Sequence, residues 1–237
     1  MRPTDVATFA RNVSAEVGRR VFGLDPVIEV IVAAVIAGKH VLLEGVPGLG
    51  KTLLLKTIST ALGCDFRRIQ FTPDLLPADV LGGYVYDPRE GQFHLRKGPI
   101  FAQVILADEI NRAPAKTQSA MLEVMQESQV TIEGETLPVP EPFLVFATQN
   151  PLEHEGVYPL PQAQLDRFAM RIHILYPQPE AEMKILASHR EPPSDPVAVA
   201  DPERLLAARA AAESVRISDE ILRIVLALTA RTRQHPG

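Results

Sequence analysis

The sequence predicts an α/β fold in which helices cover both faces of a central, mostly parallel sheet. Short apolar runs suited to buried strands alternate with stretches of helical periodicity over residues 21–176. One of these runs leads into a glycine-rich loop and a helix, and another ends in two adjacent carboxylates. Alternation of strands and helices favours parallel strands joined by crossover helices, which pack on both faces of the sheet.

The glycine-rich loop is the most informative segment. It fits the pattern G-x-x-x-x-G-K-[ST] with Gly45, Val46, Pro47, Gly48, Leu49, Gly50, Lys51 and Thr52. Residues 40–44 before it read as a buried strand, and residues 53–62, starting at Leu53, read as a helix with an apolar face. Glycines let the backbone approach phosphates, Lys51 supplies a positive charge, and the Thr52 hydroxyl can bind Mg²⁺. The free N–H groups of the helix N-terminus complete a predicted anion site.

The remaining elements are predicted in order along the chain. A first helix has Asp25 as its N-cap and ends at Gly38. Later strands are expected at 66–71, 102–107, 143–147 and 170–175. A further helix is expected at 115–128. Two segments interrupt the alternation. Residues 82–99 and 129–139 each contain two strand-like runs around a turn, so each predicts an inserted hairpin.

The chain divides into two predicted domains. Residues 1–176 form the α/β core. Residues 177–237 contain several prolines and no strand-like run, and they predict helices near 180–190, after the cap Asp201 and after the cap Ser218. We expect a small helical lid domain that is incomplete at the C-terminus, because the sequence stops just past a helix.

Composition narrows the possible classes of protein. Hydrophobic residues make up 46% and charged residues 22% of the 237 positions, which is typical of a soluble globular protein. The net charge of −5 argues against a protein that coats nucleic acid. Cys64 is the only cysteine, which excludes an intrachain disulfide and favours a cytoplasmic location. The most apolar run, residues 27–37, is too short to span a bilayer, so we expect no membrane insertion.

Two carboxylates follow the predicted strand at 102–107. Asp108, at the end of the strand, can hold Mg²⁺ through water, opposite the Thr52 hydroxyl. Glu109, the next residue, can orient or deprotonate an attacking water. The alternative is a solvated acidic strand end without a catalytic role.

Three polar residues on other segments are expected near the same site. Asn150 follows the strand at 143–147 and could position water beside the outermost phosphate, although Asn-Pro after a strand is usually only a turn. Arg167 could neutralise charge on a transferring phosphoryl group, or pair with Asp166 on the surface. Arg112 is either a contact across a subunit boundary or a surface charge at the entry of a helix.

The order of these motifs resembles the AAA+ ATPases, and in particular the MoxR family. The likeness runs from about Val21 to Arg231 and rests on the segments 42–52, 108–118, 147–151 and 164–168. The resemblance implies a Walker A motif at 45–52, a Walker B motif at Asp108 and Glu109, and a sensor-1 role for Asn150. It also implies that Arg167 is an arginine finger acting on a neighbouring subunit.

The same resemblance implies cofactors and partners. ATP and Mg²⁺ are the expected ligands, with Val21 and Phe22 packing on the adenine and Leu53 and Asp108 among the nucleotide-binding residues. A ring, with a hexamer expected, is implied, together with a protein client and a partner that carries a von Willebrand factor A domain. The hairpins at 82–99 and 129–139 are similar to the helix-2 and pre-sensor-1 inserts of such families, which face the axial channel or the client.

The chain departs from the family pattern at one functional position. The family carries a second sensor arginine in a Gly-x-Ser-Pro-Arg-like stretch of the lid, and no such stretch occurs in residues 180–237. We therefore expect an ATPase, with chaperone-like remodelling or maturation of protein complexes as its role, whose turnover is weak in this chain.

Three alternatives stay open. The first is a nucleotide-gated assembly module with little turnover. The second is a nucleic-acid motor, supported only by Arg89, His94, Arg96 and Lys97 in the first hairpin. The third is a motor subunit of the magnesium-chelatase type. A GTPase is excluded by the lack of an Asn-Lys-x-Asp guanine motif in the sequence.

Overall fold

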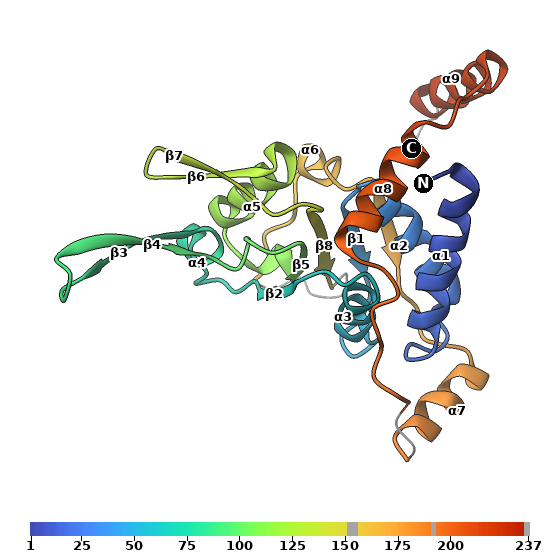
Figure 1. The fold of residues 1–237 in the computed structure, drawn as a ribbon, viewed down its shortest axis with the longest axis horizontal. Helices are drawn as coiled ribbons and strands as arrows, with labels where there is room; N and C mark the ends of the chain where they lie inside the picture. Colours follow the sequence, from blue (N-terminus) through green and yellow to red (C-terminus); the bar gives the residue numbers. More distant parts are fainter. Residues whose placement is uncertain (151–155, 191–192, 235–237) are drawn as a thin grey trace.

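The fold is seen in a computed structural model that describes residues 1–150, 156–190 and 193–234. Its centre is a five-stranded parallel sheet in the order β2-β5-β8-β1-β9. The strands are β1 (Val41–Glu44), β2 (Phe66–Gln70), β5 (Val104–Asp108), β8 (Leu144–Gln149) and β9 (Met170–His173). Each predicted strand is present within a few residues of its expected bounds, which confirms the predicted fold class (Figure 1).

Helices cover both faces of the sheet. One face carries α1 (Pro3–Gly18), α2 (Asp25–Ile36), α3 (Lys51–Ala61) and α8 (Pro202–Glu213). The other face carries α4 (Pro77–Leu81) and α5 (Ala115–Glu127), with the short α6 (Gln162–Leu165) beside them. In β5, Val104 and Leu106 face the first group, while Ile105 faces the second. A strand alternates its side chains between the faces, so this apolar strand fills two cores at once.

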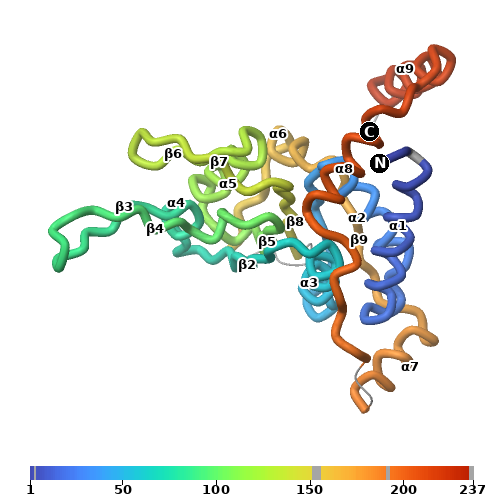
Figure 2. Tube along the Cα trace, in the orientation of Figure 1, coloured from blue at the N-terminus to red at the C-terminus, as the bar shows by residue number. Residues whose placement is uncertain are grey.

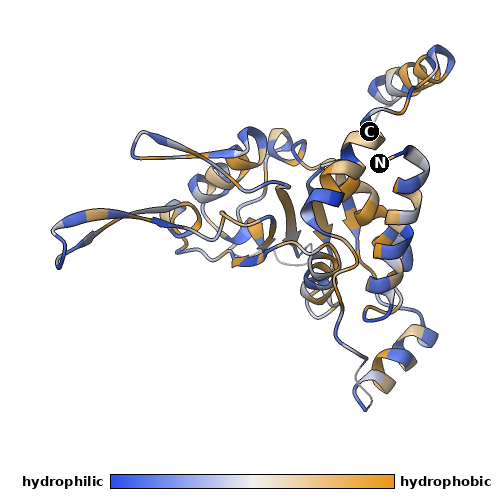
Figure 3. Cartoon of the chain, in the orientation of Figure 1, coloured by the Kyte–Doolittle hydropathy of each residue, from blue (hydrophilic) through white to orange (hydrophobic). Residues whose placement is uncertain are grey.

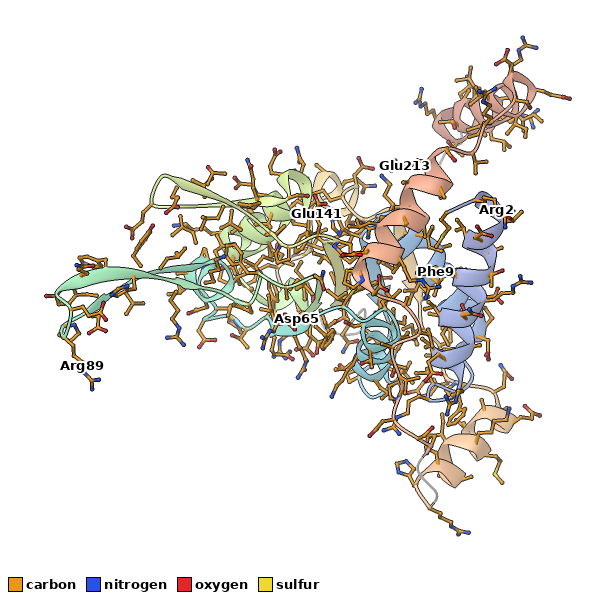
Figure 4. The ribbon with its side chains drawn as sticks, in the orientation of Figure 1. Arg2, Phe9, Asp65, Arg89, Glu141 and Glu213 are labelled. Atoms are coloured by element: carbon orange, nitrogen blue, oxygen red, sulfur yellow. The ribbon has the colours of Figure 1, made fainter. Side chains whose placement is uncertain are left out.

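Two antiparallel hairpins leave the sheet on the α5 side, as predicted. One consists of β3 (Gly82–Asp87) and β4 (Gln92–Lys97), and the other of β6 (Gln129–Ile132) and β7 (Glu135–Pro138). The tube in Figure 2 shows both reaching toward the same end of the molecule, away from α1 and α2. Arg89 lies at the far end of the longer hairpin (Figure 4).

Several helical features differ from the sequence-based expectation, and the short helices α4 and α6 were not predicted. Helix α1 was not predicted, although Phe9, Val13 and Val17 recur at helical spacing and are buried. Helix α2 begins at Asp25 itself, and its N-cap is Leu24, so the predicted cap was one residue too late. The Asp201 cap was correct, because its carboxylate accepts a hydrogen bond from the Arg204 N–H.

The three helices of residues 177–234 are placed differently from one another. Helix α8 packs on α1 and α2 and buries Leu205 in the same core as the sheet. In Figure 1, α9 (Asp219–Gln234) lies at the upper right of the view and α7 (Pro179–Ser188) at the lower right. Figure 3 shows polar and apolar residues side by side on α9. The division into a core and a lid at residue 177 stays a prediction. In the described part of the chain, no helix combines the length and the apolar character needed to cross a membrane.

Candidate functional site

The loop between β1 and α3 presents open backbone to solvent. Gly48 and Gly50 have left-handed φ values of 87° and 75°, a conformation that residues with a Cβ rarely adopt. A Cβ added at either position would meet no heavy atom within 4 Å. The two glycines therefore leave room for a ligand to approach the main chain closely.

The N-terminus of α3 has no side chain that caps it. Its N-cap is Gly50, the first turn contains no acidic residue, and no side-chain hydrogen bond reaches the first N–H groups. Unsatisfied N–H groups and the positive end of the helix dipole favour an anion at this position. The local sequence explains the geometry, since Gly-Lys-Thr supplies neither a capping oxygen before the helix nor a carboxylate in its first turn.

Lys51 is held close to the loop. Its Nζ donates to the carbonyl oxygens of Gly45 at 2.7 Å and Val46 at 2.9 Å. Burial lowers the pKa of Lys51, and the carboxylates of Asp108 and Glu109 act in the opposite direction. These two carboxylates are thus close enough to influence the ammonium group electrostatically.

The base of the loop is tied to the neighbouring strands. Glu44, at the end of β1, is only 1% exposed, and its carboxylate accepts a hydrogen bond from Gln149 of β8. It also forms an ion pair with Arg171 at 2.7 Å, and Nδ1 of His173 lies 3.2 Å from the same oxygen; both residues are on β9. A buried carboxylate needs such partners, and the result is a fixed starting point for the glycine-rich loop.

The acidic pair lies at the carboxyl end of β5. The hydroxyl of Thr148 donates to Asp108 Oδ1 at 2.5 Å and accepts the backbone N–H of Glu109 at 2.9 Å. Glu109 has a φ of 56°, unusual for a residue other than glycine, which turns its side chain off the line of the strand. Its Oε2 accepts hydrogen bonds from Gln70 at 2.8 Å and Arg112 at 3.1 Å.

A single cavity of about 400 Å³ joins these features. Its lining residues are Gly45, Pro47, Gly48, Leu49, Gly50, Lys51, Thr52, Arg68, Asp108, Glu109, Thr148, Gln149 and Asn150. The loop, the acidic pair and Asn150 come from three separate segments of the sequence. Parallel pairing of β1, β5 and β8 brings their carboxyl ends to one edge of the sheet, where such cavities form.

A second cavity, of about 290 Å³, adjoins the loop from the other side and shares Gly48, Leu49 and Gly50 with the first. It is mainly apolar, and its other lining residues are Arg20, Val21, Phe22, Leu24, Leu53, Leu175, Pro177, Ile185, Ser188 and His189. Val21, Phe22 and Leu53 were predicted as nucleotide contacts. The contribution of α7 was not predicted, because it depends on how that helix folds back on residues 20–24.

Arg167 lines neither cavity. Its guanidinium donates to the carbonyl of Ala163 at 2.7 Å and to Gln126 Oε1 at 3.0 Å. Within this chain it is therefore separate from the loop and the acidic pair. Arg112 contacts Glu109, and Val46 contributes only its carbonyl to Lys51.

Sequence reasoning missed two polar residues of the site, Arg68 and Gln70. Both are on β2, which pairs with β5 so that Gln70 lies opposite Asp108. Arg68 lines the first cavity and forms an ion pair with Asp108 at 2.6 Å. Nothing in the local sequence reveals this, since about forty residues separate the partners. The polar residues within the strand predicted at 66–71 were the only hint.

The residues present fit a nucleotide with its metal ion. The uncapped helix N-terminus, the open glycines and Lys51 suit phosphates, and the Thr52 hydroxyl and the Asp108 carboxylate offer the oxygen ligands that Mg²⁺ prefers. The adjoining apolar cavity has the character needed to bury a planar base.

Sheet order, loop and cavity together define a P-loop domain of the AAA class. The sequence model of one protein family, the ATPase family associated with various cellular activities (AAA), matches residues 40–170 of this chain. Among similar proteins, Chaperone MoxR1 of Mycobacterium tuberculosis is 54% identical over 171 residues, which are 72% of this chain and 45% of that protein. The uncharacterized protein YeaC of Bacillus subtilis is 45% identical over 209 residues, 86% of this chain and 65% of YeaC.

A crystal structure agrees with these sequence matches. A candidate ATPase from Cytophaga hutchinsonii superposes with a TM-score of 0.85 at 44% identity, over 95% of this chain and 70% of that one. The chain belongs to the MoxR family of AAA ATPases. It spans about two thirds of the length of YeaC and less than half of that of MoxR1.

Proposed function

We propose that this protein binds ATP with Mg²⁺ and hydrolyses it at the edge of the sheet, and that it uses the cycle to remodel or mature protein complexes. The observation that carries this proposal is the shared cavity of the glycine-rich loop, the acidic pair and Asn150. The similarity to a protein named as a chaperone supports the remodelling role.

Each site residue has a distinct task in this proposal. The loop N–H groups and Lys51 bind the phosphates, and Thr52 and Asp108 would hold Mg²⁺, which neutralises phosphate charge when bound. Glu109 orients the attacking water and accepts its proton, while Asn150 fixes the position of that water. Val21, Phe22 and Leu53 bury the base.

The proposal extends to assembly. Arg167 lies outside the cavity of its own subunit, which suits a residue that serves the neighbouring site. We therefore propose a ring, with a hexamer expected, in which residues 177–237 contribute a lid. A protein client, a partner with a von Willebrand factor A domain and a cytoplasmic location belong to the same proposal.

A nucleotide-gated assembly module is the second candidate, and one observation favours it. Glu109 Oε2 accepts hydrogen bonds from both Gln70 and Arg112, so one oxygen of the proposed base is already engaged by the protein. If this arrangement persists with nucleotide bound, ATP controls assembly and turnover stays near background.

The test compares three variants with the wild-type protein. Glu109→Gln should bind ATP as tightly as wild type and lose about 10²–10⁴-fold in turnover, because the amide cannot accept a proton. Lys51→Ala should lose binding itself. Glu123→Gln, the same change on an exposed position of α5, is the control and should hydrolyse normally.

The outcomes separate the candidates when turnover is measured at high protein concentration. Tight ATP binding with wild-type turnover at background selects the assembly module. Undiminished hydrolysis in Glu109→Gln contradicts the assigned role of that residue.

A further inference from the structure

Both oxygens of the Asp108 carboxylate accept hydrogen bonds before any ligand arrives. Thr148 donates to its Oδ1. The Nε and Nη2 of Arg68 both converge on its Oδ2, at 2.9 Å and 2.6 Å. Asp108 is 14% exposed, so these bonds form in a partly desolvated site, where charge-assisted hydrogen bonds are strong. A metal ion that needs a carboxylate oxygen of Asp108 therefore meets a competitor already in place.

The position of Arg68 follows from strand pairing. Arg68 lies opposite Leu106, and Gln70 lies opposite Asp108, two residues further along each strand. Leu106 faces the core beneath α3, so Arg68 and Asp108 lie on that same face, which the glycine-rich loop also covers. The guanidinium reaches along the strand to the carboxylate and lines the nucleotide cavity.

We propose that the positively charged guanidinium of Arg68 takes the place of the metal ion at the Asp108 carboxylate. It neutralises Asp108 while the site lacks nucleotide, and it must leave Oδ2 before Mg²⁺ can bind this oxygen. Arg68 thus sets the concentration of Mg²⁺ at which nucleotide binds well. This inference rests on the function proposed above.

The neighbouring Arg67 provides a matched control. It lies opposite Ile105, which faces the other core, so its side chain is on the opposite face of the sheet. Its side chain is 61% exposed, pairs only loosely with Asp65 at 3.7 Å and does not line the cavity. Arg67→Gln and Arg68→Gln remove the same charge from adjacent positions, and only Arg68→Gln releases Asp108.

The experiment titrates Mg²⁺ against binding of a fluorescent, non-hydrolysable ATP analogue, starting from protein treated with a chelator. Arg68→Gln should lower the half-saturating free Mg²⁺ by about tenfold, the effect expected for one charge-assisted hydrogen bond that no longer competes. Arg67→Gln should change it by less than about twofold, as expected for an exposed, weakly paired charge. Arg68→Lys, which keeps the charge without the two-pronged contact, should lie between wild type and Arg68→Gln.

Three results would overturn the inference, and each has a different meaning. Equal half-saturating Mg²⁺ in wild type and Arg68→Gln, with normal nucleotide binding, rejects the competitor role and leaves the proposed function intact. Weaker nucleotide binding by Arg68→Gln at every Mg²⁺ concentration, without a lower Mg²⁺ requirement, identifies Arg68 as a phosphate ligand instead. Failure of wild type to bind the analogue at any Mg²⁺ concentration rejects both the inference and the function. Thermal unfolding of each variant verifies that the fold is retained.

Discussion

Thr148 links the two carboxylates that follow β5. Its hydroxyl accepts the N–H of Glu109 and donates to Asp108, so one side chain fixes both the backbone turn and a carboxylate orientation. The residue is 1% exposed, and a buried hydroxyl needs such partners. An alanine here would leave the partly buried N–H of Glu109, the residue proposed to activate water, without its acceptor.

Cys64 is the only cysteine, and its thiol is buried beside the end of α3. Burial raises the pKa of this thiol from 9.0 to about 11. The thiolate is the reactive form, so the folded protein holds Cys64 in an unreactive state at neutral pH.

We predict that a thiol-specific reagent modifies native Cys64 about 100-fold more slowly at pH 8 than it modifies the unfolded protein, from the thiolate fraction alone. The same shift makes stability depend on alkali. Because the folded-state pKa is raised, the stabilisation is complete below pH 9 and is lost as the pH rises from 9.0 to about 11. Labelling with and without denaturant measures the first effect, and equal rates would contradict it.

Among the larger elements, the sheet and α5 are joined through His40, just before β1. Its Nδ1 accepts the N–H of Val145 on β8 at 3.0 Å, and its Nε2 lies 3.1 Å from the carbonyl of Met125 on α5. A carbonyl can only accept, so the ring is neutral with its proton on Nε2. Burial lowers the pKa of His40, and the nearby Arg209 and Lys39 lower it further.

Because His40 is neutral in the folded protein, its contacts with β8 and α5 are sensitive to acid. A lowered folded-state pKa means that the unfolded chain binds the extra proton first, so stability is complete above the ordinary histidine pKa of 6.5 and falls as the pH drops below it. We predict that the melting temperature falls between pH 7 and pH 5, and that His40→Asn weakens this dependence at some cost in stability. Equal pH slopes of the melting temperature in the wild type and in His40→Asn would contradict this role of His40.

At the scale of the whole molecule, the two hairpins and the helical side lie at opposite ends (Figure 1). The hydroxyl of Tyr84 on β3 donates to Glu135 on β7 at 2.5 Å, so the hairpins contact each other beyond the sheet. Arg167, near α6, is outside the cavity that contains Lys51. Within one chain, the site therefore has no contribution from the residue proposed as the arginine finger.

A subunit-mixing experiment tests whether Arg167 serves a neighbouring site. Arg167→Ala alone should lose about 10³-fold in turnover, the usual effect of removing an arginine finger. Glu109→Gln alone should be similarly inactive. Mixed rings would contain interfaces with an intact Glu109 on one subunit and an intact Arg167 on the next, so part of the activity should return.

The control mixture replaces Arg167→Ala with a double variant, Arg167→Ala and Glu109→Gln in one chain, which cannot form an intact interface with Glu109→Gln. Arg11→Ala, an exposed change on α1, should leave turnover unaltered. Absence of recovery in the first mixture would count against a role in trans.

Local sequence was sufficient wherever the chemistry lies within a few neighbouring residues. The pattern from Gly45 to Thr52 determined the loop and the start of α3, since glycine conformations and an uncapped helix are properties of adjacent residues. The apolar runs ending at Asp108 and near Asn150 determined which polar groups follow buried strands. Their meeting at one edge could be predicted because parallel strands share a direction.

Tertiary structure alone decided the contacts between distant segments. Arg68 reaches Asp108 only because β2 pairs with β5, and α7 lines the apolar cavity only because it folds back on residues 20–24. Helix α8 resembles any alanine-rich helix in sequence, yet it packs on α1 and α2. These partners are chosen by packing and by burial of apolar surface over the whole chain, and no short stretch of sequence carries that information.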